Sequence, residues 1–401
     1  MAKQKLLKPE FEFYSLDRIF KECPKDRFLY YMIIGERSNG KSFAVQEYSL
    51  REYLKNGSQM AFIRRWDTDW EDGNTNKVWE QFVSNPYRGN VITEISKGKW
   101  NDIIYYRSCW YLIKRAEKPF IDDVSGKRIE IGEIIEKDKK PFAYRFALNL
   151  EEHYKGTAYP GIRNILFDEF ITRGYYLRGG DEFVLFTSLI STIVRLEDKA
   201  RIFMLANTIS TSCPYFREMG IRKIKDMQPG QIDIYEYGES GLRLALEYAP
   251  NDAVRNTKKK SNKYFAFENP KLKMITEGGW EIALYPHLPI DYEYTRKNIL
   301  YEYFIVYEGE TFHCEILHTK NPESIITYIH RKTTPIKEDN QNMVYTPEHD
   351  IRPWYARRIN KPSNRIMELI LKLFVMEKIY YQDNEVGESI HHYIDWCYNH
   401  A

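Results

Sequence analysis

The residues with the clearest chemical signal form a glycine-rich segment near the amino end of the chain. The run Gly35-Glu36-Arg37-Ser38-Asn39-Gly40-Lys41-Ser42 matches the phosphate-binding pattern G-x-x-x-x-G-K-[ST] at every fixed position. Glycines let backbone N–H groups turn inward around a phosphate, and the start of a following helix adds partial positive charge. Lys41 is then expected to reach the β- and γ-phosphates, and the hydroxyl of Ser42 to bind Mg²⁺. We predict a nucleotide site from residues 35–42 with Phe43 and Arg64 beside it.

A second signature lies about 130 residues further along the chain. The apolar run 164–167 reads as a buried strand and ends in Asp168 and Glu169. Asp168 would hold Mg²⁺, directly or through water, and Glu169 would orient and polarise the attacking water. Acid pairs after an apolar run also cap helices, so the pair gains its meaning from the complete phosphate loop upstream.

These side chains need a parallel sheet to position them. An apolar run at 28–34 precedes the glycine-rich segment, and a helical pattern over 41–55 follows it until Asn56-Gly57. Further strands are expected at 59–63 and 201–206, with a helix over 181–196 between strands. The alternation predicts an α/β fold with its site at the carboxyl ends of the strands.

The roles of four polar residues beside these elements remain open. Arg64 and Arg65 end one strand and would face a phosphate, or would be solvated strand ends. Asn207 ends another strand, where it could sense the γ-phosphate or simply favour a turn. Arg195 closes a helix, where a cation is favoured by the helix dipole.

Composition excludes several classes of protein. The chain has 401 residues, 43% hydrophobic and 29% charged, with a formal net charge of +2. So small a net charge does not indicate overall attraction to nucleic acid, so any DNA contact must come from local basic patches. Five cysteines are far apart and form no CxxC pair, which argues against both a disulfide framework and a zinc site and fits a reducing cytoplasm. No long uncharged apolar run occurs, so we expect neither a secreted nor a membrane protein.

Changes in composition and residue pattern along the chain indicate the domain organisation. We expect a nucleotide-binding domain over 1–250 that carries an inserted β-meander at about 89–150. A basic segment, 254–273, carries aromatic residues and lies in an expected linker over 251–290. It is either a solvated face or a contact for nucleic acid. The region 291–401 opens with a hairpin over 303–317 and contains a helix over 364–375.

The order of these motifs resembles the DNA-packaging (encapsidation) ATPases of phi-29-like tailed phages, which are relatives of terminase large subunits. The likeness covers the first half of the chain closely, through a series of segments with the sequences YSLDRIF at 14–20, the glycine-rich run at 35–42, AFIRRW at 61–66, KGTAYP at 155–160, ILFDEFI at 165–171, residues 192–195 and LANTISTSCPYF at 205–216. The second half is similar only in outline. The lead-in at 14–18 could pack on an adenine ring or simply cover the site.

The resemblance implies an additional-strand P-loop ATPase that works in a ring. The strand 202–207 would lie between the strands that carry the glycine-rich segment and Asp168. Arg195 would be an arginine finger that enters the neighbouring subunit's site, and Lys155 would be a second basic residue offered in the same way. Asn207 would be the sensor. Asp67 stands where relatives can carry a basic residue, so a phosphate role beyond Arg65 is not expected.

The resemblance also implies a small RNase H-like domain at the carboxyl end. Terminase nucleases hold two metals with a cluster of acids, one of them in the middle of the first strand. Here the candidate strand 303–307 contains no acid, and four glutamates sit at strand edges or the turn, where acids are usually solvated: Glu302, Glu308, Glu310 and Glu315. We expect a vestigial nuclease domain that binds nucleic acid or the portal vertex.

These observations predict an ATP-driven translocase of double-stranded DNA that packages a phage genome into a procapsid, with ATP and Mg²⁺ as cofactors. Its expected partners are DNA, the portal and other copies in a ring, which the family suggests is a pentamer, with a packaging RNA in some relatives. It would work in the host cytoplasm and at the portal vertex. The alternatives are a packaging ATPase with a working nuclease and a non-catalytic scaffold that binds nucleotide.

Overall fold

The structure, a computed structural model, describes residues 8, 12–70, 74–123, 127–172, 176–177, 182–195, 199–210, 213–250, 284–289, 292–319, 324–336, 343–350 and 352–399. The chain forms two compact units. The first comprises Met1–Phe170, Leu185–Thr208 and Asp226–Gly279, and the second comprises Ile171–Val184, Ile209–Lys225 and Trp280–Ala401. The basic segment 254–273 and most of the expected linker 251–290 lie outside the described residues.

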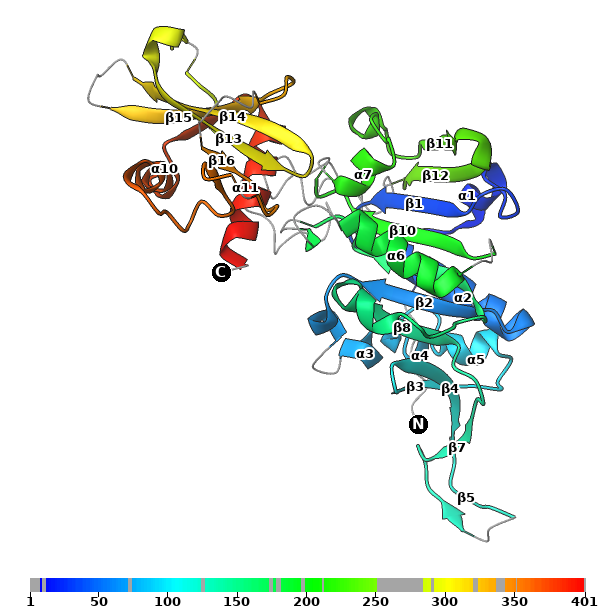
Figure 1. Ribbon diagram of the computed structural model, residues 1–401. Coiled ribbons are helices and arrows are strands. Elements are labelled where there is room, and N and C mark those ends of the chain that lie inside the picture. The colour runs from blue at the N-terminus through cyan, green and yellow to red at the C-terminus, as the bar shows by residue number, and fades with distance from the viewer. Residues whose placement is uncertain are drawn as a thin grey trace. The chain divides into compact units, whose positions relative to one another are not determined.

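A mostly parallel sheet forms the centre of the first unit (Figure 1). Its strand order is β11-β12-β1-β10-β9-β2-β8-β4-β3. The strands of the central part are β1 (Tyr30–Gly35), β2 (Gln59–Arg64), β8 (Ala143–Ala147), β9 (Ile162–Asp168), β10 (Arg201–Asn207), β11 (Ile232–Tyr237) and β12 (Leu242–Tyr248). Strand β10 pairs in parallel with β1 on one side and with β9 on the other. The predicted additional-strand arrangement is therefore confirmed.

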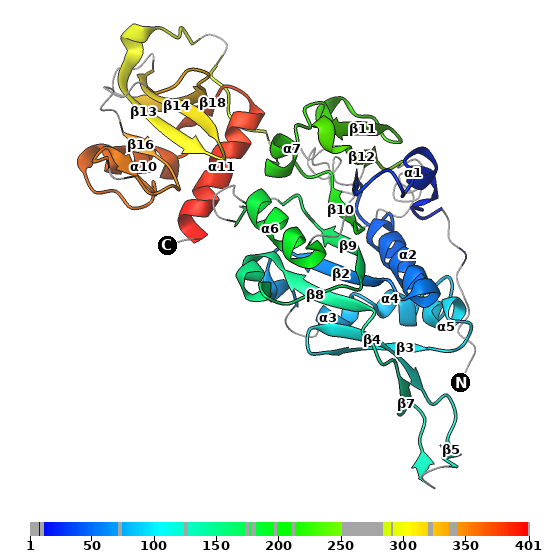
Figure 2. The same ribbon diagram turned by 45° about the vertical axis from the view of Figure 1, so that its right-hand side comes forward.

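Two long helices cover opposite faces of this sheet, as Figure 2 shows. Helix α2 (Lys41–Asn56) begins after Gly40 and ends at Gly57, and both glycines have the left-handed backbone that favours glycine. Helix α6 (Glu182–Val194) connects β9 to β10. Successive residues of β9 show the two faces: Leu166 joins the core cluster that α2 packs on, while the ring of Phe167 stacks on Phe186 of α6. This alternation is the period-two pattern of a strand buried on both faces.

An antiparallel ribbon extends the sheet beyond β8. It contains β3 (Asp102–Tyr106), β4 (Cys109–Arg115) and β7 (Ile134–Lys137), and the small hairpin of β5 (Phe120–Ile121) and β6 (Arg128–Ile129) lies beyond β4 and β7 in an arm (Figure 1). Strand β8 pairs in parallel with β2 and antiparallel with β4, so it joins the ribbon to the parallel sheet. Trp110 is fully buried and its indole N–H donates to the carbonyl of Thr75, which anchors the ribbon.

The first unit contains the short helices α1 (Asp17–Glu22), α3 (Asn74–Lys77), α4 (Glu80–Val83) and α5 (Val91–Ile95), with 3₁₀ turns at Asp67–Trp70, Leu148–Tyr154 and Gly238–Ser240. Helix α7 (Pro214–Glu218) and the 3₁₀ turn Arg296–Asn298 belong to the second unit, and the turn Ile224–Asp226 spans the division between the two units. Within the part of the chain that is described, no helix has both the length and the apolar character needed to cross a bilayer.

The second unit is built on a separate mixed sheet with the order β17-β16-β13-β14-β15-β18. The strands are β13 (Ile299–Tyr307), β14 (Glu310–His318), β15 (Ile325–Arg331), β16 (Val344–Tyr345), β17 (Tyr355–Ala356) and β18 (Ile379–Tyr381). β13, β14 and β15 form an antiparallel meander, and β16 joins β13 in parallel. A meander that continues into parallel strands beside its first strand has the strand order expected of an RNase H-like domain, and β18 adds a parallel strand beside β15.

Helices α10 (Arg365–Val375) and α11 (Asn384–Asn399) contribute to one core with alternate residues of the meander. Asn364 caps α10, because its side chain accepts a hydrogen bond from the N–H of Met367. Tyr303, Ile305 and Tyr307 of β13 point into this core and are almost fully buried.

Two expectations about the acids of this unit are wrong. The first strand starts at Ile299, four residues earlier than predicted, so Glu302 lies inside β13. Glu315 lies inside β14 with 3% of its surface exposed, and the Glu308 side chain is only 5% exposed. The residue type alone predicts exposed acids, whereas tertiary contacts bury Glu315 inside the sheet and the Glu308 side chain in the turn beside Arg217.

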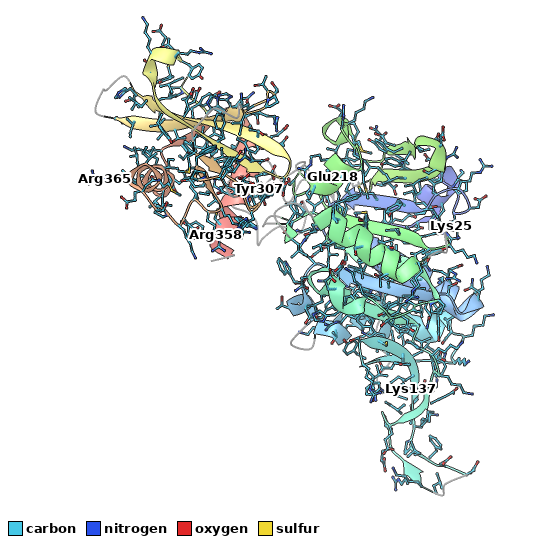
Figure 3. All side chains as sticks on the ribbon, viewed as in Figure 1. Lys25, Lys137, Glu218, Tyr307, Arg358 and Arg365 are labelled. Atoms are coloured by element: carbon cyan, nitrogen blue, oxygen red, sulfur yellow. The ribbon has the colours of Figure 1, made fainter. Side chains whose placement is uncertain are left out.

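Glu308 occupies the turn between β13 and β14, next to the buried Tyr307 that Figure 3 labels. Burial raises the pKa of Glu308 to about 7, although Arg217, 3.7 Å away, acts in the opposite direction. The folded state therefore holds a proton that the unfolded chain releases near pH 4.5. The contribution of Glu308 to the stability of the fold is fully present below that pH and is lost as pH rises through about 7.

We expect the Glu308→Gln variant to keep this stability as pH rises, because glutamine does not lose a proton. Between pH 5 and pH 8 the variant should gain up to about 3 kcal/mol of stability relative to the natural chain, because each pKa unit corresponds to about 1.4 kcal/mol. Thermal midpoints of the full chain and variant at both pH values measure the change. Glu368→Gln, at an exposed position of α10, is the control. An equal midpoint difference at pH 5 and pH 8 for Glu308→Gln would contradict the assignment.

Candidate nucleotide site

The glycine-rich segment forms a tight loop between β1 and α2. Ser38 and Gly40 both have positive φ, 62° and 94°, so the loop reverses the chain twice before the helix begins at Lys41. A Cβ at Gly35 would lie 3.0 Å from the Cβ of Ala249, and one at Gly40 would lie 3.3 Å from Phe13. Close packing therefore favours glycine at both positions, and backbone conformation favours it at Gly40 as well. The loop presents the amino end of α2, which favours an anion.

Lys41 is buried and its ammonium is held by the loop itself. Its Nζ donates to the carbonyl of Glu36 at 2.7 Å, to that of Gly35 at 3.2 Å and to Oδ1 of Asn39 at 3.2 Å. These three acceptors fix the ammonium against the loop, where a bound phosphate would meet it. The role of Asn39 in holding Lys41 has no signal in the sequence, because the fixed positions of the pattern leave residue 39 free.

Asp168 lies directly opposite Ser42. The Ser42 hydroxyl donates to Oδ1 of Asp168 at 3.0 Å, and Nη2 of Arg64 lies 3.7 Å from Oδ2. Burial raises the pKa of Asp168 and Glu169 adds to the rise, while Arg64, Ser42 and Lys41 act against it. A hydroxyl and a carboxylate in contact at a buried position are the oxygen ligands that Mg²⁺ takes in such sites. The residues present therefore fit the predicted metal.

Glu169 leaves the end of β9 in a constrained conformation. Its φ is 61°, a left-handed value that is uncommon for a residue other than glycine, and its side chain is exposed. Arg65 holds the backbone here: Nη1 donates to the Glu169 carbonyl at 3.2 Å and Nη2 to the Phe170 carbonyl at 2.7 Å. Arg65 is 6% exposed, so it is a positioning residue for Glu169 and does not face a phosphate in this structure.

Asn207 lies at the same edge of the sheet. In the parallel pairing of β1 with β10 it is opposite Gly35, and in the pairing of β10 with β9 Leu205 is opposite Asp168. The strand order therefore brings the phosphate loop, the acid pair and Asn207 to one edge, as expected for the carboxyl ends of parallel strands.

Arg195 and Lys155 lie at the other edge. Arg195 follows α6 and precedes β10, and its Nη2 donates to the carbonyl of Thr157, just before β9. Lys155 pairs with Glu152 at 2.7 Å and Glu151 at 3.5 Å. The hydrogen bond to Glu152 is the main reason why the pKa of Lys155 is raised. A strand of seven residues is roughly 20 Å long, so both cations are about that far from their own phosphate loop.

The other residues predicted for the nucleotide site are either exposed or buried. Arg37 and Ser38 are exposed on the loop, and Glu36 and Asn39 are buried in it. Phe43 stacks on Phe82 with ring centroids 4.4 Å apart, so it packs α2 onto α4. 

Asp67, the residue that departs from relatives, is paired with Arg145 of β8, and its N–H donates to Oδ1 of Asn149 at 2.9 Å. These contacts join the segment after β2 to β8 and to the turn that follows β8.

The lead-in at 14–18 lies against the phosphate loop. The Tyr14 N–H donates to the carbonyl of Asn39 at 2.9 Å, and its hydroxyl donates to Glu247 of β12 at 2.5 Å. Arg18 lies 3.6 Å from the same carboxylate, which is buried. Burial raises the pKa of Glu247, and the contacts from Tyr14 and Arg18 oppose that rise. This anchor ties the lead-in to the sheet beside β1, a contact across 233 residues that the sequence did not indicate.

Comparison with known proteins places this geometry among phage packaging proteins. The family model of the Podovirus DNA encapsidation protein (Gp16) matches residues 124–236. A DNA packaging protein of Bacillus phage B103 is 24% identical over 310 residues, which cover 68% of this chain and 81% of that protein. The DNA packaging protein of Bacillus phage phi29 is 26% identical over 194 residues, which cover 48% of this chain and 46% of that protein.

Solved structures show the same fold over nearly the whole chain. The Phi-28 gp11 DNA packaging motor has a TM-score of 0.54 at 17% identity and covers 96% of this chain and 97% of its own. The viral genome packaging motor assembly of bacteriophage Phi-29 has a TM-score of 0.51 at 16% identity and covers 95% and 99%. The resemblance inferred from the motifs is confirmed: this chain is similar to the DNA-packaging proteins of phi29-like phages in sequence across two thirds of its length and in fold across almost all of it.

Proposed function

We propose that this chain is the ATPase of a phage DNA-packaging motor, an ATP-driven translocase that moves double-stranded DNA into a procapsid. The observation that carries the proposal is the gathering of Lys41, Ser42, Asp168 and Glu169 at one edge of the sheet, with Arg195 exposed at the opposite edge. The first set is what a P-loop ATPase needs for its own nucleotide. The position of Arg195 is what a ring of identical subunits needs for its neighbour's nucleotide.

The residues of one subunit would act in sequence on the bound triphosphate. Lys41 would exchange its backbone acceptors for β- and γ-phosphate oxygens, which are stronger acceptors because they are charged. Ser42 and Asp168 would hold Mg²⁺, which neutralises charge on the phosphates when bound. Glu169, fixed from behind by Arg65, would orient the attacking water and take its proton. Asn207, beside the loop, would sense whether the γ-phosphate is present.

Arg195 would complete the neighbouring site. A guanidinium stabilises the charge that develops on the transferred phosphoryl group, and supplying it from another subunit makes hydrolysis depend on assembly. Lys155, at the same edge, would be the second cation offered across the interface. Hydrolysis around the ring would then be coupled from one subunit to the next.

The partners follow from the same proposal. Double-stranded DNA, the portal and other copies of the chain are the partners, with a pentameric ring and a packaging RNA as family-based expectations. The working places are the host cytoplasm and the portal vertex of the procapsid.

The domain roles remain those expected from sequence: an ATPase over 1–250, a linker over 251–290 and a vestigial nuclease domain over 291–401. Incubating plasmid DNA with the chain and Mg²⁺ or Mn²⁺ tests the last role, because cutting would favour a packaging ATPase with a working nuclease.

Glu169→Gln separates a motor from a non-catalytic scaffold that binds nucleotide. The variant should still bind ATP but hydrolyse it about 10²- to 10⁴-fold more slowly, because the amide cannot accept the proton of water. DNA-stimulated ATPase rates and ATP affinity, measured at concentrations that permit oligomers, give both quantities. Glu236→Gln, at an exposed position of β11, is the matched control. Unchanged turnover in Glu169→Gln would favour the scaffold.

Arg195→Ala tests the action of one subunit on another. Alone it should lower ATP turnover about 10³-fold or more in the assembled motor and leave ATP affinity unchanged. Mixing it with Lys41→Ala should restore part of the activity, because each variant supplies what the other lacks. Arg163→Ala, an arginine bonded to backbone carbonyls at the same edge, is the control. If the mixture stays as inactive as either variant alone, Arg195 does not act across the interface.

Arg65→Lys tests the positioning of Glu169. Lysine cannot hold two carbonyls in the fork geometry of a guanidinium, so the turn after β9 should shift. We expect kcat for ATP to fall about 10²-fold, the cost of a displacement near 1 Å, while ATP affinity changes little. Arg201→Lys, an arginine bonded to the Lys25 carbonyl at the other edge, is the control. A loss of ATP affinity with unchanged kcat would show that Arg65 contacts nucleotide instead.

A further inference from the structure

The second unit carries a cluster of histidine and glutamate side chains on the face of its sheet opposite the core. In the pairing of β13, β14 and β15, Phe304, His313 and His330 form one row across the three strands. Glu302, Glu315 and Tyr328 form the next row on the same face, two residues along each strand. Neighbouring rows on one face lie within reach of one another's side chains. Register alone therefore gathers two imidazoles around a glutamate.

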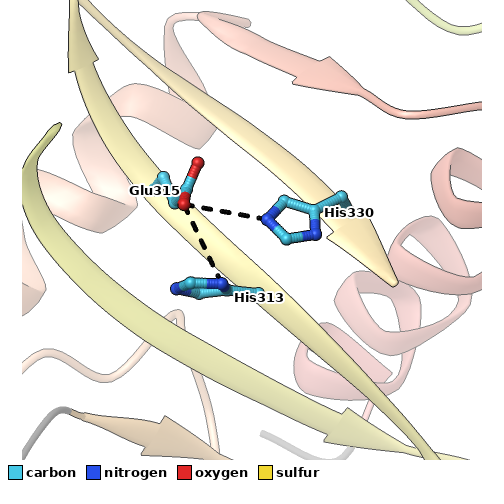
Figure 4. Close-up of side chains that lie close together, drawn as sticks. All are labelled: His313, Glu315 and His330. Carbon is cyan, nitrogen blue, oxygen red and sulfur yellow. Dashed lines mark ion pairs between the residues drawn. The ribbon is translucent and has the colours of Figure 1, made fainter. Parts of the chain in front are cut away.

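The inner atoms of this cluster face one another at distances that suit a shared ion. Oε1 of Glu315 lies 3.9 Å from Nδ1 of His313 and 3.8 Å from Nε2 of His330, as Figure 4 shows. One ligand atom from each of the three residues lies within 4.8 Å of the other two. Both distances are too long for good hydrogen bonds. Three atoms bound at about 2.0–2.1 Å in tetrahedral geometry would be about 3.3 Å apart, so small side-chain rotations would close the set.

Each of the three residues has a partner on its outer side. Nε2 of His313 lies 3.5 Å from Oε1 of Glu302, and Nδ1 of His330 lies 3.4 Å from the Arg331 carbonyl. Tyr294 donates to Oε2 of Glu315 at 2.5 Å. With an ion bound, these acceptors would take the protons of the outer nitrogens and leave the inner nitrogens free to bind the ion. This is how metal-binding histidines are oriented in proteins.

We propose that His313, Glu315 and His330 bind one divalent transition-metal ion of the zinc class, with Glu302, Tyr294 and the Arg331 carbonyl as the groups that orient them. A site with two imidazoles and one carboxylate suits Zn²⁺ better than Mg²⁺ or Ca²⁺. The histidine side chains are 16% and 25% exposed, which leaves room for water on the ion. The ion would fasten β14 to β15 and to the segment that carries Tyr294. It differs from the acid cluster of a two-metal nuclease, and it does not depend on the proposed motor function.

Metal binding by the full, tag-free chain tests the site directly. After treatment with a chelator and dialysis, the natural chain should take up one tightly bound Zn²⁺ in equilibrium dialysis with metal analysis. Co²⁺ in its place should give visible absorption without the charge-transfer band of cysteine ligation. The thermal midpoint of the full chain should rise when Zn²⁺ is added, because the ion binds the folded state.

Variants locate the ion. Glu315→Gln keeps the shape and the acceptor for Tyr294 but loses the charge, and it should lower Zn²⁺ affinity at least about 100-fold. His330→Gln should do the same, which keeps the test valid if one variant is unstable. Glu302→Gln should lower affinity about 10- to 100-fold, the usual effect of an outer partner. His318→Ala, on the same strand but outside the cluster, is the matched control and should bind like the natural chain.

The thermal midpoint and the affinity for Zn²⁺ decide between a metal site and a hydrogen-bond network. Loss of the zinc-induced rise in thermal midpoint in Glu315→Gln and His330→Gln, with the rise retained in His318→Ala, supports the site. A natural chain that binds Zn²⁺ no more tightly than both ligand variants overturns it, and the cluster is then a network of a buried carboxylate and its hydrogen-bond donors.

Discussion

The contact between Asp168 and Ser42 is the interaction on which the first unit depends. It joins the end of β9 to the start of α2 across 126 residues of sequence, at a largely buried position. A carboxylate is costly to bury, and its cost is offset here by the Ser42 hydroxyl and by Arg64. The same contacts place oxygen ligands beside Lys41 and the phosphate loop. Folding and the assembly of the nucleotide site are therefore one event.

The direction of the strands separates two sets of functional side chains. In a parallel sheet each strand delivers its carboxyl end to one edge, and each connecting helix returns the chain to the other. Lys41, Asp168, Glu169 and Asn207 follow the first rule. Arg195 follows the second because it ends a returning helix. The fold thus places Arg195 away from its own phosphate loop and exposes it, as the proposed action on a neighbouring subunit would require.

The second unit uses the two faces of one sheet differently. Alternate residues of β13, such as Tyr303 and Ile305, pack on α10 and α11, while the residues between them line the opposite face. On that face polar side chains are enclosed by the rows beside them and by Tyr294, so Glu315 is buried without joining the hydrophobic core. A buried carboxylate without partners would be strongly disfavoured, so Glu315 depends on the groups that contact it.

The sequence alone determined the phosphate loop, the acid pair, the strand and helix alternation of the first unit and the resemblance to packaging ATPases. These features are local: glycine spacing, apolar runs and their polar ends are legible within short stretches. Tertiary structure decided the carbonyl clamp of Arg65, the anchor between Tyr14 and Glu247, and the burial of Glu308 and Glu315. Each joins segments far apart in the chain or depends on strand register, and a shift of one residue would turn every side chain of a strand to the other face. No short-range pattern encodes that choice.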